Sequence, residues 1–402
     1  MSSDGQPDLL AAALELLREA GLAQVTQRAV AARAGVPAAT LQHRFAGKDE
    51  MLRQLFGRLF GDAELALRRL AEGPARPPLP PASVCALLTS SVVAPGRETP
   101  ALLEALAQAV RSPVGRPAAQ AWLGALHALW RRLLVEHGGD VDNAAWFLVE
   151  LQIGVLLLSL GGGRLQETAL ANAELARFAC FGPEAATGEW FSRLIRAEAG
   201  LLAQATLPDA GPERGALLQR LLEAGVALVA QSGPDELSFR TLAARAGTSL
   251  SAVTHHFPRR DRLLYAIYRH IHDLLTSTAA SAAASDPAGH FVASVTDGEV
   301  AGAPLFLVST ELSLAAARTP AFADMAWMIR LTRGGYVALR GDPAFDPASR
   351  RAFALHARSL WQSGCALVQA ARVAEDALPD LLRRRHGFAE RAFQNGLFAA
   401  LR

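Results

Sequence analysis

The residues of this chain that could do chemistry stand out in a short motif that occurs twice. The first copy runs from Ala31 to Leu52 and the second from Ala243 to Leu264, and the two align without a gap at a constant offset of 212 positions. Each copy gathers polar, histidine and small apolar side chains, the types that contact base-pair edges in the major groove. Each copy therefore predicts a helix-turn-helix that presents a short helix to DNA.

Hydroxyl residues and a glycine are expected to position the first helix of each motif. Thr26 and Ser238 should cap that helix, because a side-chain oxygen can accept a hydrogen bond from a free backbone N–H one turn further on. Gly35 and Gly247 stand where the chain must turn sharply. A positive φ at such a turn costs little only for glycine, so these positions predict the end of the first helix.

The second helix of each motif is expected to begin at Pro37 in the first copy and at Ser249 in the second. Two apolar residues four positions apart should face the core in each copy: Leu41 with Phe45, and Val253 with Phe257. The remaining side chains of this helix should point outward. Glutamine can then bond adenine, threonine can reach either kind of base pair, and alanine or leucine can contact the thymine methyl group.

A basic residue follows each motif at the predicted start of the next helix, Lys48 in the first copy and Arg260 in the second. A cation and free backbone N–H groups can hold a phosphate there. Together with the outward positions and the capped turn, these residues form the predicted DNA-binding set: Thr26, Gln27, Arg28, Ala38, Thr40, Gln42, His43, Lys48, Ser238, Arg240, Thr241, Leu250, Ala252, Thr254, His255 and Arg260.

Similarity between the two halves extends beyond the motif. Four upstream positions match at the same offset: Leu10, Leu14, Leu17 and Gly21 with Leu222, Val226, Val229 and Gly233. Two weaker matches follow in the same order: Arg97-Glu-Thr-Pro100 with Arg318-Thr-Pro320, and Leu151-Gln-Ile-Gly154 with Trp361-Gln-Ser-Gly364. A chain of 402 residues is also too long for one ordinary core. These matches therefore favour a duplicated unit of about two hundred residues, a normal domain size.

Apolar residues recur at helical spacing between the breaks, and alternating β-branched segments are lacking. The sequence therefore predicts an all-α fold of two similar units. We predict these segments: a first helix-turn-helix domain at 1–47, a first regulatory domain at 48–206, a Pro/Gly-rich linker at 207–213, a second helix-turn-helix domain at 214–259 and a second regulatory domain at 260–402.

Both halves resemble the TetR family of bacterial transcription regulators. In the first half the resemblance rests on Thr26, Arg28, Ala31, Ala34, Gly35, Val36, Thr40, Leu41, Phe45, Lys48 and Leu52. In the second half it rests on Ser238, Arg240, Ala243, Ala246, Gly247, Ser249, Val253, His256, Phe257, Arg260 and Leu264. The resemblance implies a three-helix DNA-binding head, followed by a larger helical body that binds a small ligand and pairs with a partner.

The chain departs from the family's pattern at several positions of the second motif helix. Gln42 and Thr254 stand where the family usually has a tyrosine that touches the DNA backbone. The usual glycine inside this helix is Ala39 or Ser251. Arg44 replaces a histidine that the second copy keeps as His256, and Arg260 replaces the usual lysine. These departures concern the contacts to the DNA backbone.

The resemblance implies that the last two long helices of each body form a four-helix bundle. Those helices are expected at 141–160 and 187–205 in the first half, and at 348–372 and about 387–401 in the second. Gly154 and Gly364 lie on these helices, where glycine permits close approach. Both pairs belong to one chain, so we expect an intramolecular pseudo-dimer. Further dimerisation of two tandem chains is the alternative.

By the same resemblance, the bodies are expected to bind a small apolar or amphipathic effector in a pocket. The candidate lining residues are Trp122, His127, Trp130 and Trp146 in the first body, and Phe306, Trp327, Met328 and Tyr336 in the second. The alternative is that these side chains are core, which is the commoner role of aromatic and methionine residues at helical spacing.

Composition excludes several other classes of protein. The three cysteines, Cys85, Cys180 and Cys365, are odd in number and far apart in sequence, which is typical of a reduced cytoplasmic protein. The N-terminus lacks the basic and apolar regions of a signal peptide. The apolar run at 151–160 is too short to span a bilayer, so no membrane partner is expected. A net charge of +2 means that any DNA-binding surface must be local.

We also expect no metal site, no cofactor and no enzymatic activity. His255 and His256 are neighbours on a helix and point to different sides, so they do not converge on a metal ion. The chain has no Cys-x-x-Cys spacing, no phosphate-binding loop and no convincing set of nucleophile and base.

The sequence thus predicts a cytoplasmic, ligand-responsive DNA-binding regulator, a repressor that is associated with the nucleoid when bound to DNA. Its two heads should read similar but non-identical half-sites about one helical turn (~34 Å) apart. The family resemblance implies that ligand would shift the helices that begin at Lys48 and Arg260 and change the spacing of the heads. The alternative is a module that sequesters a small molecule and in which one or both heads are degenerate.

Overall fold

The computed structural model describes residues 8–72, 79–93, 96–160, 165–197, 212–282, 286–296, 304–319, 323–332 and 349–402. Every regular element within these ranges is a helix, which confirms the predicted all-α fold. The predicted linker, 207–213, lies largely outside the described residues, and the helix that follows it already begins at Pro212.

The first half contains ten α-helices among the described residues. They are α1 (Leu9–Ala20), α2 (Gln27–Ala34), α3 (Ala38–Arg44), α4 (Lys48–Ala71), α5 (Pro81–Val93), α6 (Thr99–Arg111), α7 (Arg116–Leu134), α8 (Val141–Ser159), α9 (Leu165–Phe181) and α10 (Glu189–Ala197). Short 3₁₀ turns join some of them: η1 (Leu22–Gln24), η2 (Val135–His137) and η3 (Pro183–Ala185).

The second half repeats this order from α12 onward. Its described helices are α12 (Pro212–Ser232), α13 (Phe239–Arg245), α14 (Leu250–His256), α15 (Arg260–Ala282), α16 (Pro287–Thr296), α17 (Leu305–Arg318), α18 (Ala323–Thr332), α20 (Arg350–Arg372), α21 (Leu378–Asn395) and α22 (Leu397–Ala400). The 3₁₀ turns here are η4 (Pro234–Glu236) and η6 (Glu375–Ala377).

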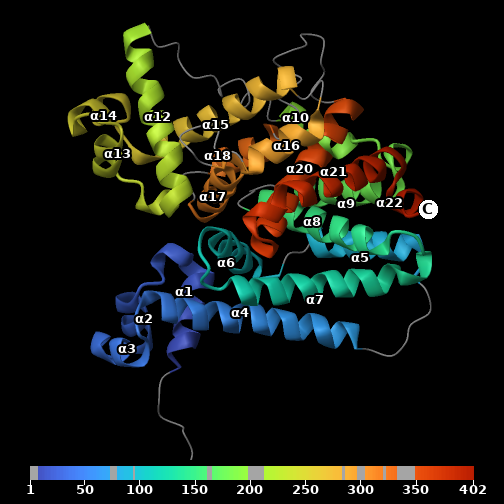
Figure 1. Cartoon of the computed structure of the whole chain (residues 1–402), viewed down its shortest axis with the longest axis horizontal. Helices are drawn as coiled ribbons and strands as arrows, with labels where there is room; N and C mark the ends of the chain where they lie inside the picture. Colours follow the sequence, from blue (N-terminus) through green and yellow to red (C-terminus); the bar gives the residue numbers. More distant parts are fainter. Residues whose placement is uncertain are drawn as a thin grey trace, which may run out of the picture.

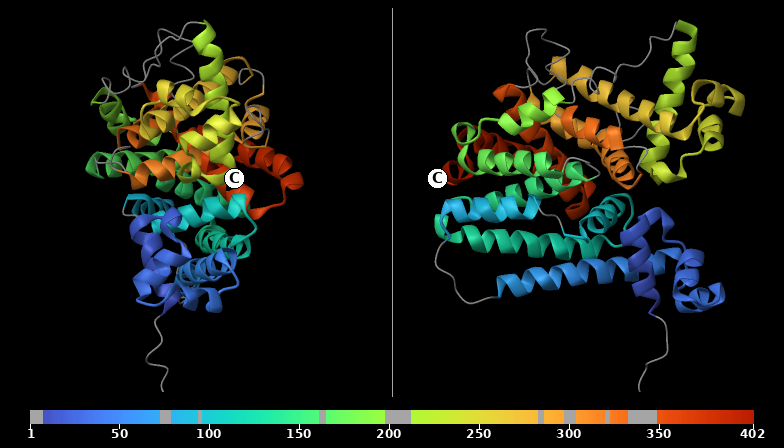
Figure 2. Two further views of the ribbon diagram at one scale, coloured as in Figure 1. Left: turned by 90° about the vertical axis from the view of Figure 1, so that its left-hand side faces the viewer. Right: turned by 180° about the vertical axis from the view of Figure 1, so that it is seen from behind.

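The two three-helix heads lie on the same side of the molecule. Figure 1 shows α1–α3 and α12–α14 at the left, one below the other, while the helices of both bodies extend to the right. The view from behind in Figure 2 agrees, with both heads on the right. Helix α4 leads away from the first head and α15 leads away from the second. This arrangement leaves both heads free to approach one partner from the same direction.

Among the described helices, α8 of the first half and α20 of the second form the most extensive pair. Two glycines make this approach possible. A Cβ atom added to Gly154 would overlap the carbonyl oxygen of Leu360, and one added to Gly364 would overlap that of Glu150. The predicted role of Gly154 and Gly364 in close helix contact is therefore confirmed.

The bundle between the halves differs from the expectation in both halves, since the helix predicted at about 387–401 is α21, which begins at Leu378 and ends at Asn395. Helix α9, at Leu165–Phe181, contacts α21 and α22 of the other half, and its Phe178 packs against Phe353 and Phe393. Of the helix predicted at 187–205, the structure describes α10 (Glu189–Ala197), and the remainder lies outside the described residues. Helix α10 is the shorter of the two, and it covers α20 from the side through Phe191.

A buried polar cluster also joins the two bodies. Glu150 on α8 is fully buried and accepts hydrogen bonds from both Nε and Nη2 of Arg385 on α21, at 2.8 and 2.9 Å. Trp361 and Gln369 on α20 donate to the same carboxylate. Arg385 further donates to the carbonyl oxygen of Asn143. A buried charge is tolerable only when it is paired and hydrogen-bonded, and here every partner of Glu150 comes from the other half.

Helix α8 is apolar along its length because it lies in the core. It is the one described helix that is long and apolar enough to cross a membrane, although 78% of its most apolar window is buried inside the protein. The apolar stretch is longer than the expected run at 151–160, since it begins at Val141. Its composition is explained by the neighbours that it contacts, which include α5, α7 and α20.

Candidate nucleic-acid interface

The predicted caps are present in both heads. The Thr26 side-chain oxygen accepts a hydrogen bond from the Ala29 amide at 3.1 Å, and α2 begins directly after it. In the second head Ser238 accepts from the Thr241 amide at 3.1 Å. The hydroxyl oxygen of Thr241 accepts in return from the Ser238 amide, which completes a capping box. Thr241 therefore has a structural task in addition to its predicted role at DNA.

The turn of each motif depends on glycine because of its backbone conformation. Gly35 has a φ of 66° and Gly247 a φ of 62°, both in the left-handed region. A Cβ atom at either position would meet no heavy atom within 4 Å, so crowding is not the reason for glycine here. The reason is the conformation itself, which L-residues with a side chain adopt at a cost.

The second helix of each motif has the predicted inner and outer faces. Leu41 and Phe45 are buried, as are Val253 and Phe257. The outer residues Ala38, Thr40, Gln42, His43, Leu250, Thr254 and His255 are exposed, whereas Ala252 is half-buried. The Leu250 side chain is 48% exposed. A protruding leucine at the start of α14 is suited to a thymine methyl group.

The first and second heads differ in the residue that should grip a phosphate. Lys48 is exposed at the first position of α4. Arg260 occupies the same position of α15, but its guanidinium donates to the carbonyl oxygens of Leu237 and Pro234, at 3.3 and 2.5 Å. Arg260 also lies 3.7 Å from a carboxylate oxygen of Asp235. To hold DNA it would have to exchange these bonds for a phosphate.

The other predicted contact residues flank the second helix of each motif. Thr26, Arg28, Ser238 and Arg240 are exposed, and Gln27 is half-buried. They lie at the first turn of α2 and of α13, next to the cap. Backbone N–H groups at a helix start and a nearby arginine can both approach a phosphate. The structure thus brings the predicted residues of the first half together in the first head, and those of the second half together in the second head.

The four candidate pocket residues of the first body are packed against neighbours. The rings of Trp122 and Phe60 lie 5.4 Å apart, and the Trp130 indole N–H donates to the Gln152 side chain at 3.1 Å. The rings of His127 and Trp146 stack at 4.1 Å. Burial lowers the pKa of His127, which favours the neutral ring. A pocket formed by these four residues stays a prediction.

One candidate residue of the second body does line a cavity. Phe306 borders a space of about 60 Å³ together with Val295, Thr310 and Leu367, and Val110 of the first body reaches the same space. Trp327 is buried on α18, and its indole nitrogen has no hydrogen-bond partner among the described residues. Tyr336 and the side chain of Met328 lie outside the described part of the chain.

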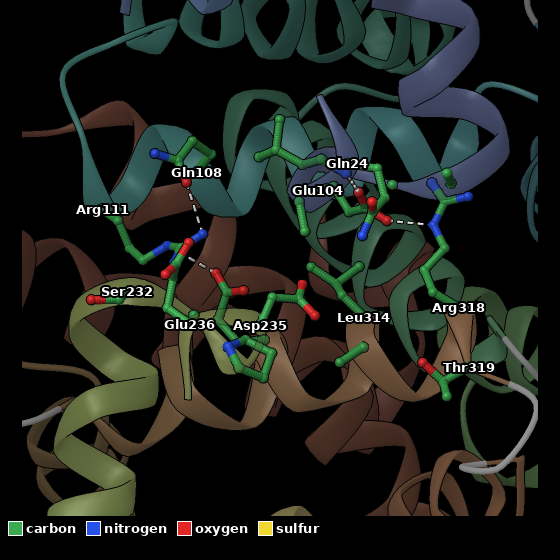
Figure 3. A pocket seen from close by; sticks show the side chains of 18 of the residues that line it. Gln24, Glu104, Gln108, Arg111, Ser232, Asp235, Glu236, Leu314, Arg318 and Thr319 are labelled. Atoms are coloured by element: carbon green, nitrogen blue, oxygen red, sulfur yellow. Dashed lines mark hydrogen bonds and ion pairs between the residues drawn. The ribbon is translucent and has the colours of Figure 1, made fainter. Parts of the chain in front are cut away.

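A larger cavity, which was not predicted, lies between the bases of the two heads. It has a volume of about 360 Å³ and is lined by both head bases and by α6 and α17 (Figure 3). Most of its lining is charged or polar. The signal that could have revealed it is a glutamate followed seven positions later by an arginine, which occurs in α6 and again in α17.

Neither cysteines nor metal ligands form a site within the described ranges. Cys85, Cys180 and Cys365 are all buried and unbridged. No group of three or more potential ligands gathers in that part of the chain. The ring centroids of His255 and His256 lie 5.8 Å apart.

The comparison with known proteins agrees with the geometry of the heads. The model for bacterial regulatory proteins of the tetR family matches residues 9–55 and again residues 221–267, which cover each head and the first turns of α4 or α15. Among curated proteins, none matches this sequence. Two helix-turn-helix heads on an all-helical chain define a DNA-binding protein. The chain carries the DNA-binding segment of the TetR family of transcriptional regulators twice.

Proposed function

We propose that this chain is a ligand-responsive repressor that reads both halves of an imperfect palindrome as a single molecule. The main support is the position of α3 and α14, two exposed recognition helices on the same side of one polypeptide (Figure 1). Helix-turn-helix proteins usually bring two such helices together by dimerisation. In this chain a covalent link would keep the second head at a high effective concentration once the first has bound.

The two heads should prefer different half-sites because their outer residues differ. The first presents Thr40, Gln42 and His43, and glutamine is suited to adenine. The second presents Leu250 and Thr254 on the corresponding face. The operator should therefore be an imperfect palindrome with two unequal half-sites. The centres of these half-sites should lie about one helical turn (~34 Å) apart.

Contacts between α8 and α20 support an intramolecular pseudo-dimer. The glycine contact at Gly154 and Gly364 and the carboxylate of Glu150 both join the first half to the second. These are the helices that the family resemblance assigns to dimerisation. With this face occupied by its own other half, the chain should bind its operator as a monomer.

The effector would be small and apolar or amphipathic, and it would bind in a body. Support comes from the cavity beside Phe306, whose lining also includes Val295 and Leu367. Its volume of about 60 Å³ is well below that of typical ligand pockets, roughly 300–1,000 Å³, so the body would have to open to take a ligand. Movement of α17, which carries Phe306 and contacts α12 and α15, would pass this opening to the second head.

A DNase footprint on the DNA beside the gene tests the proposal. Protection should cover two unequal half-sites with their centres about one turn apart. Gln42→Ala should weaken one half-site, and Leu250→Ala the other, each by about tenfold, since one good base contact contributes roughly 1–3 kcal/mol. Glu184→Ala, at an exposed position on η3 in the first body, is the control. Protection of identical half-sites that both variants weaken equally would contradict the assignment.

A second function is favoured by the state of Arg260. Because its guanidinium is bonded to its own head, the second head could be a degenerate scaffold on a protein that sequesters a small molecule. The footprint separates the two functions. Protection of a single half-site that Leu250→Ala leaves unchanged would indicate that the second head does not read DNA.

A further inference from the structure

The two heads rest on a seam that is formed by one helix from each body. Helices α6 and α17 contact each other between the heads, and each ends in an arginine (Figure 1). In α6 this is Arg111, seven residues after Glu104, and in α17 it is Arg318, seven residues after Glu311. The same spacing in corresponding helices indicates that the duplicated unit brought one glutamate and one arginine to each side.

The arginines pair across the two halves. Arg318 Nε lies 2.5 Å from a carboxylate oxygen of Glu104, and Arg111 Nε lies 3.1 Å from one of Glu311. All four side chains are largely buried. Figure 3 shows Arg111 and Arg318 at opposite ends of the cavity, with Arg318 turned toward Glu104. Each pair therefore joins the two bodies directly beneath a head.

The pair beneath the first head is extended by backbone bonds. Arg318 donates to the carbonyl oxygens of Arg18 and Leu17, at 2.9 and 3.1 Å, which are the last carbonyls of α1. A cation is favourable there because the end of a helix carries partial negative charge. Glu104 accepts from the Leu22 amide at 2.7 Å. An arginine of the second body thus holds the first head by its base.

The pair beneath the second head lacks these bonds. Pro234 stands at the position of Leu22 and has no N–H to offer Glu311. Arg111 donates instead to the Gln108 side chain at 2.7 Å, and within the described ranges it reaches no carbonyl at the end of α12. The Oε1 atom of Glu311 and the Nε atom of Arg111 are close, but neither has a hydrogen bond of good geometry within those ranges.

We propose that these two pairs position the heads: each joins the two bodies directly beneath one head and so sets the distance between the recognition helices, but within the described ranges only the pair of Glu104 and Arg318 is also hydrogen-bonded to its head. The inference rests on the proposed function as far as DNA is concerned. It goes beyond that function because the coupling passes between the halves through α6 and α17, and because the two heads are held unequally.

The looser pair should also respond to pH. Burial raises the pKa of Glu311 to about 7, since the effect of Arg111, which lowers it, is offset in part by the nearby carboxylates of Glu104 and Asp235. The other charged groups around the cavity are Arg318 on the same helix, and Lys48 and Glu236. Burial also raises the pKa of Glu104, but the Leu22 amide and Arg318 favour its charged form.

The direction of the effect follows from the charge of Glu311. Above pH 7 its carboxylate is charged and attracts Arg111, so the two bodies are held together beneath the second head; below pH 7 the neutral acid loses this attraction. Global stability moves the other way. The folded chain binds this proton more tightly than the unfolded chain, whose pKa is 4.5, so the free energy of unfolding falls as pH rises from 4.5 toward 7.

The distance between the heads can be measured without DNA. Spin labels at Gln42→Cys and Thr254→Cys report this distance by double electron–electron resonance. The same labelling reaction on the protein without these two substitutions checks that the three buried native cysteines take up no label. We expect one narrow distribution at pH 8 and a broader one at pH 6. Glu311→Gln should be broad at both pH values, whereas Pro234→Ala, which restores an N–H donor, should be narrow at both. Equal distributions in all three proteins at both pH values would overturn the proposal.

Footprints at pH 6 and pH 8 connect the distance to DNA, and they use the parent, Glu311→Gln and Pro234→Ala proteins without the label cysteines, so that Gln42 and Thr254 are intact. Relative to the first half-site, affinity for the second should fall by up to about tenfold at pH 6 in the parent protein, since one pH unit below a pKa of about 7 leaves about one Glu311 carboxylate in ten charged. Glu311→Gln removes this change, and so separates it from any effect of His43 and His255 on the recognition helices. Binding of DNA with the same pH dependence in parent and Glu311→Gln would overturn the inference. Altered distances without any DNA binding would refute the proposed function alone.

Discussion

Replacing Arg385 by alanine is expected to lower the free energy of unfolding by about 3–5 kcal/mol. The side chain is 1% exposed and holds both oxygens of Glu150, which is itself fully buried. Without the guanidinium, Glu150 would keep only the donors of Trp361 and Gln369, and its charge would be uncompensated in the core. Urea denaturation followed by tryptophan fluorescence measures the loss, since Trp361 reports on this contact.

Two controls separate a buried charge from simple truncation. Arg193→Ala removes an exposed partner of Glu189 and should change stability by less than about 1 kcal/mol. The double variant Glu150→Gln with Arg385→Met keeps the acceptor for Trp361 and removes both charges. It should recover at least half of the stability lost in Arg385→Ala. If Arg385→Ala lost no more than Arg193→Ala, the cluster would contribute little to the union of the bodies.

Gly154→Leu is expected to have the second large effect, a loss of about 3 kcal/mol or more, because it overpacks a backbone contact. Even a Cβ atom at this position overlaps the Leu360 carbonyl oxygen, and that backbone cannot rotate away as a side chain would. Helix α8 would have to move off α20. The change should also uncouple the heads, so that footprints show the two half-sites filled independently.

The matched control is Gly387→Ala on α21. This glycine is exposed inside a helix, and a Cβ atom there would meet no heavy atom within 4 Å. Because alanine is the better helix former, stability should rise by up to about 1 kcal/mol. A Gly154→Leu protein as stable as Gly387→Ala would show that α8 and α20 are not in close contact in solution.

The cavity between the bases of the two heads shows how the two copies of a duplicated sequence can come to differ in their hydrogen bonds. Leu22 and Pro234 hold the same position at the two head bases, and a single missing N–H leaves one buried carboxylate with fewer partners. The recognition helices differ at residues such as Gln42 and Thr254. They would therefore read DNA from two heads that are held by different numbers of hydrogen bonds. A pseudo-symmetric operator with one stronger half-site would suit such a protein.

The sequence by itself determined the heads. Thr26 and Ser238 cap their helices, Gly35 turns with a positive φ, and Leu41 with Phe45 faces inward, all as the pattern predicts. These features depend on hydrogen bonds and contacts between residues three or four positions apart, which a single chain segment displays directly. The glycine contact of the bodies was also predictable, because Gly154 and Gly364 recur in a repeated segment.

Only the tertiary structure decided how the halves meet. Glu150 and Arg385 are 235 positions apart, and Arg318 reaches carbonyls about 300 positions away, so no local spacing announces either contact. Helix α9 in the bundle and the inward turn of Arg260 were missed for the same reason. A buried charged side chain must be paired, and its partner is the group that the packing of distant helices brings within reach. The partner therefore depends on the fold as a whole.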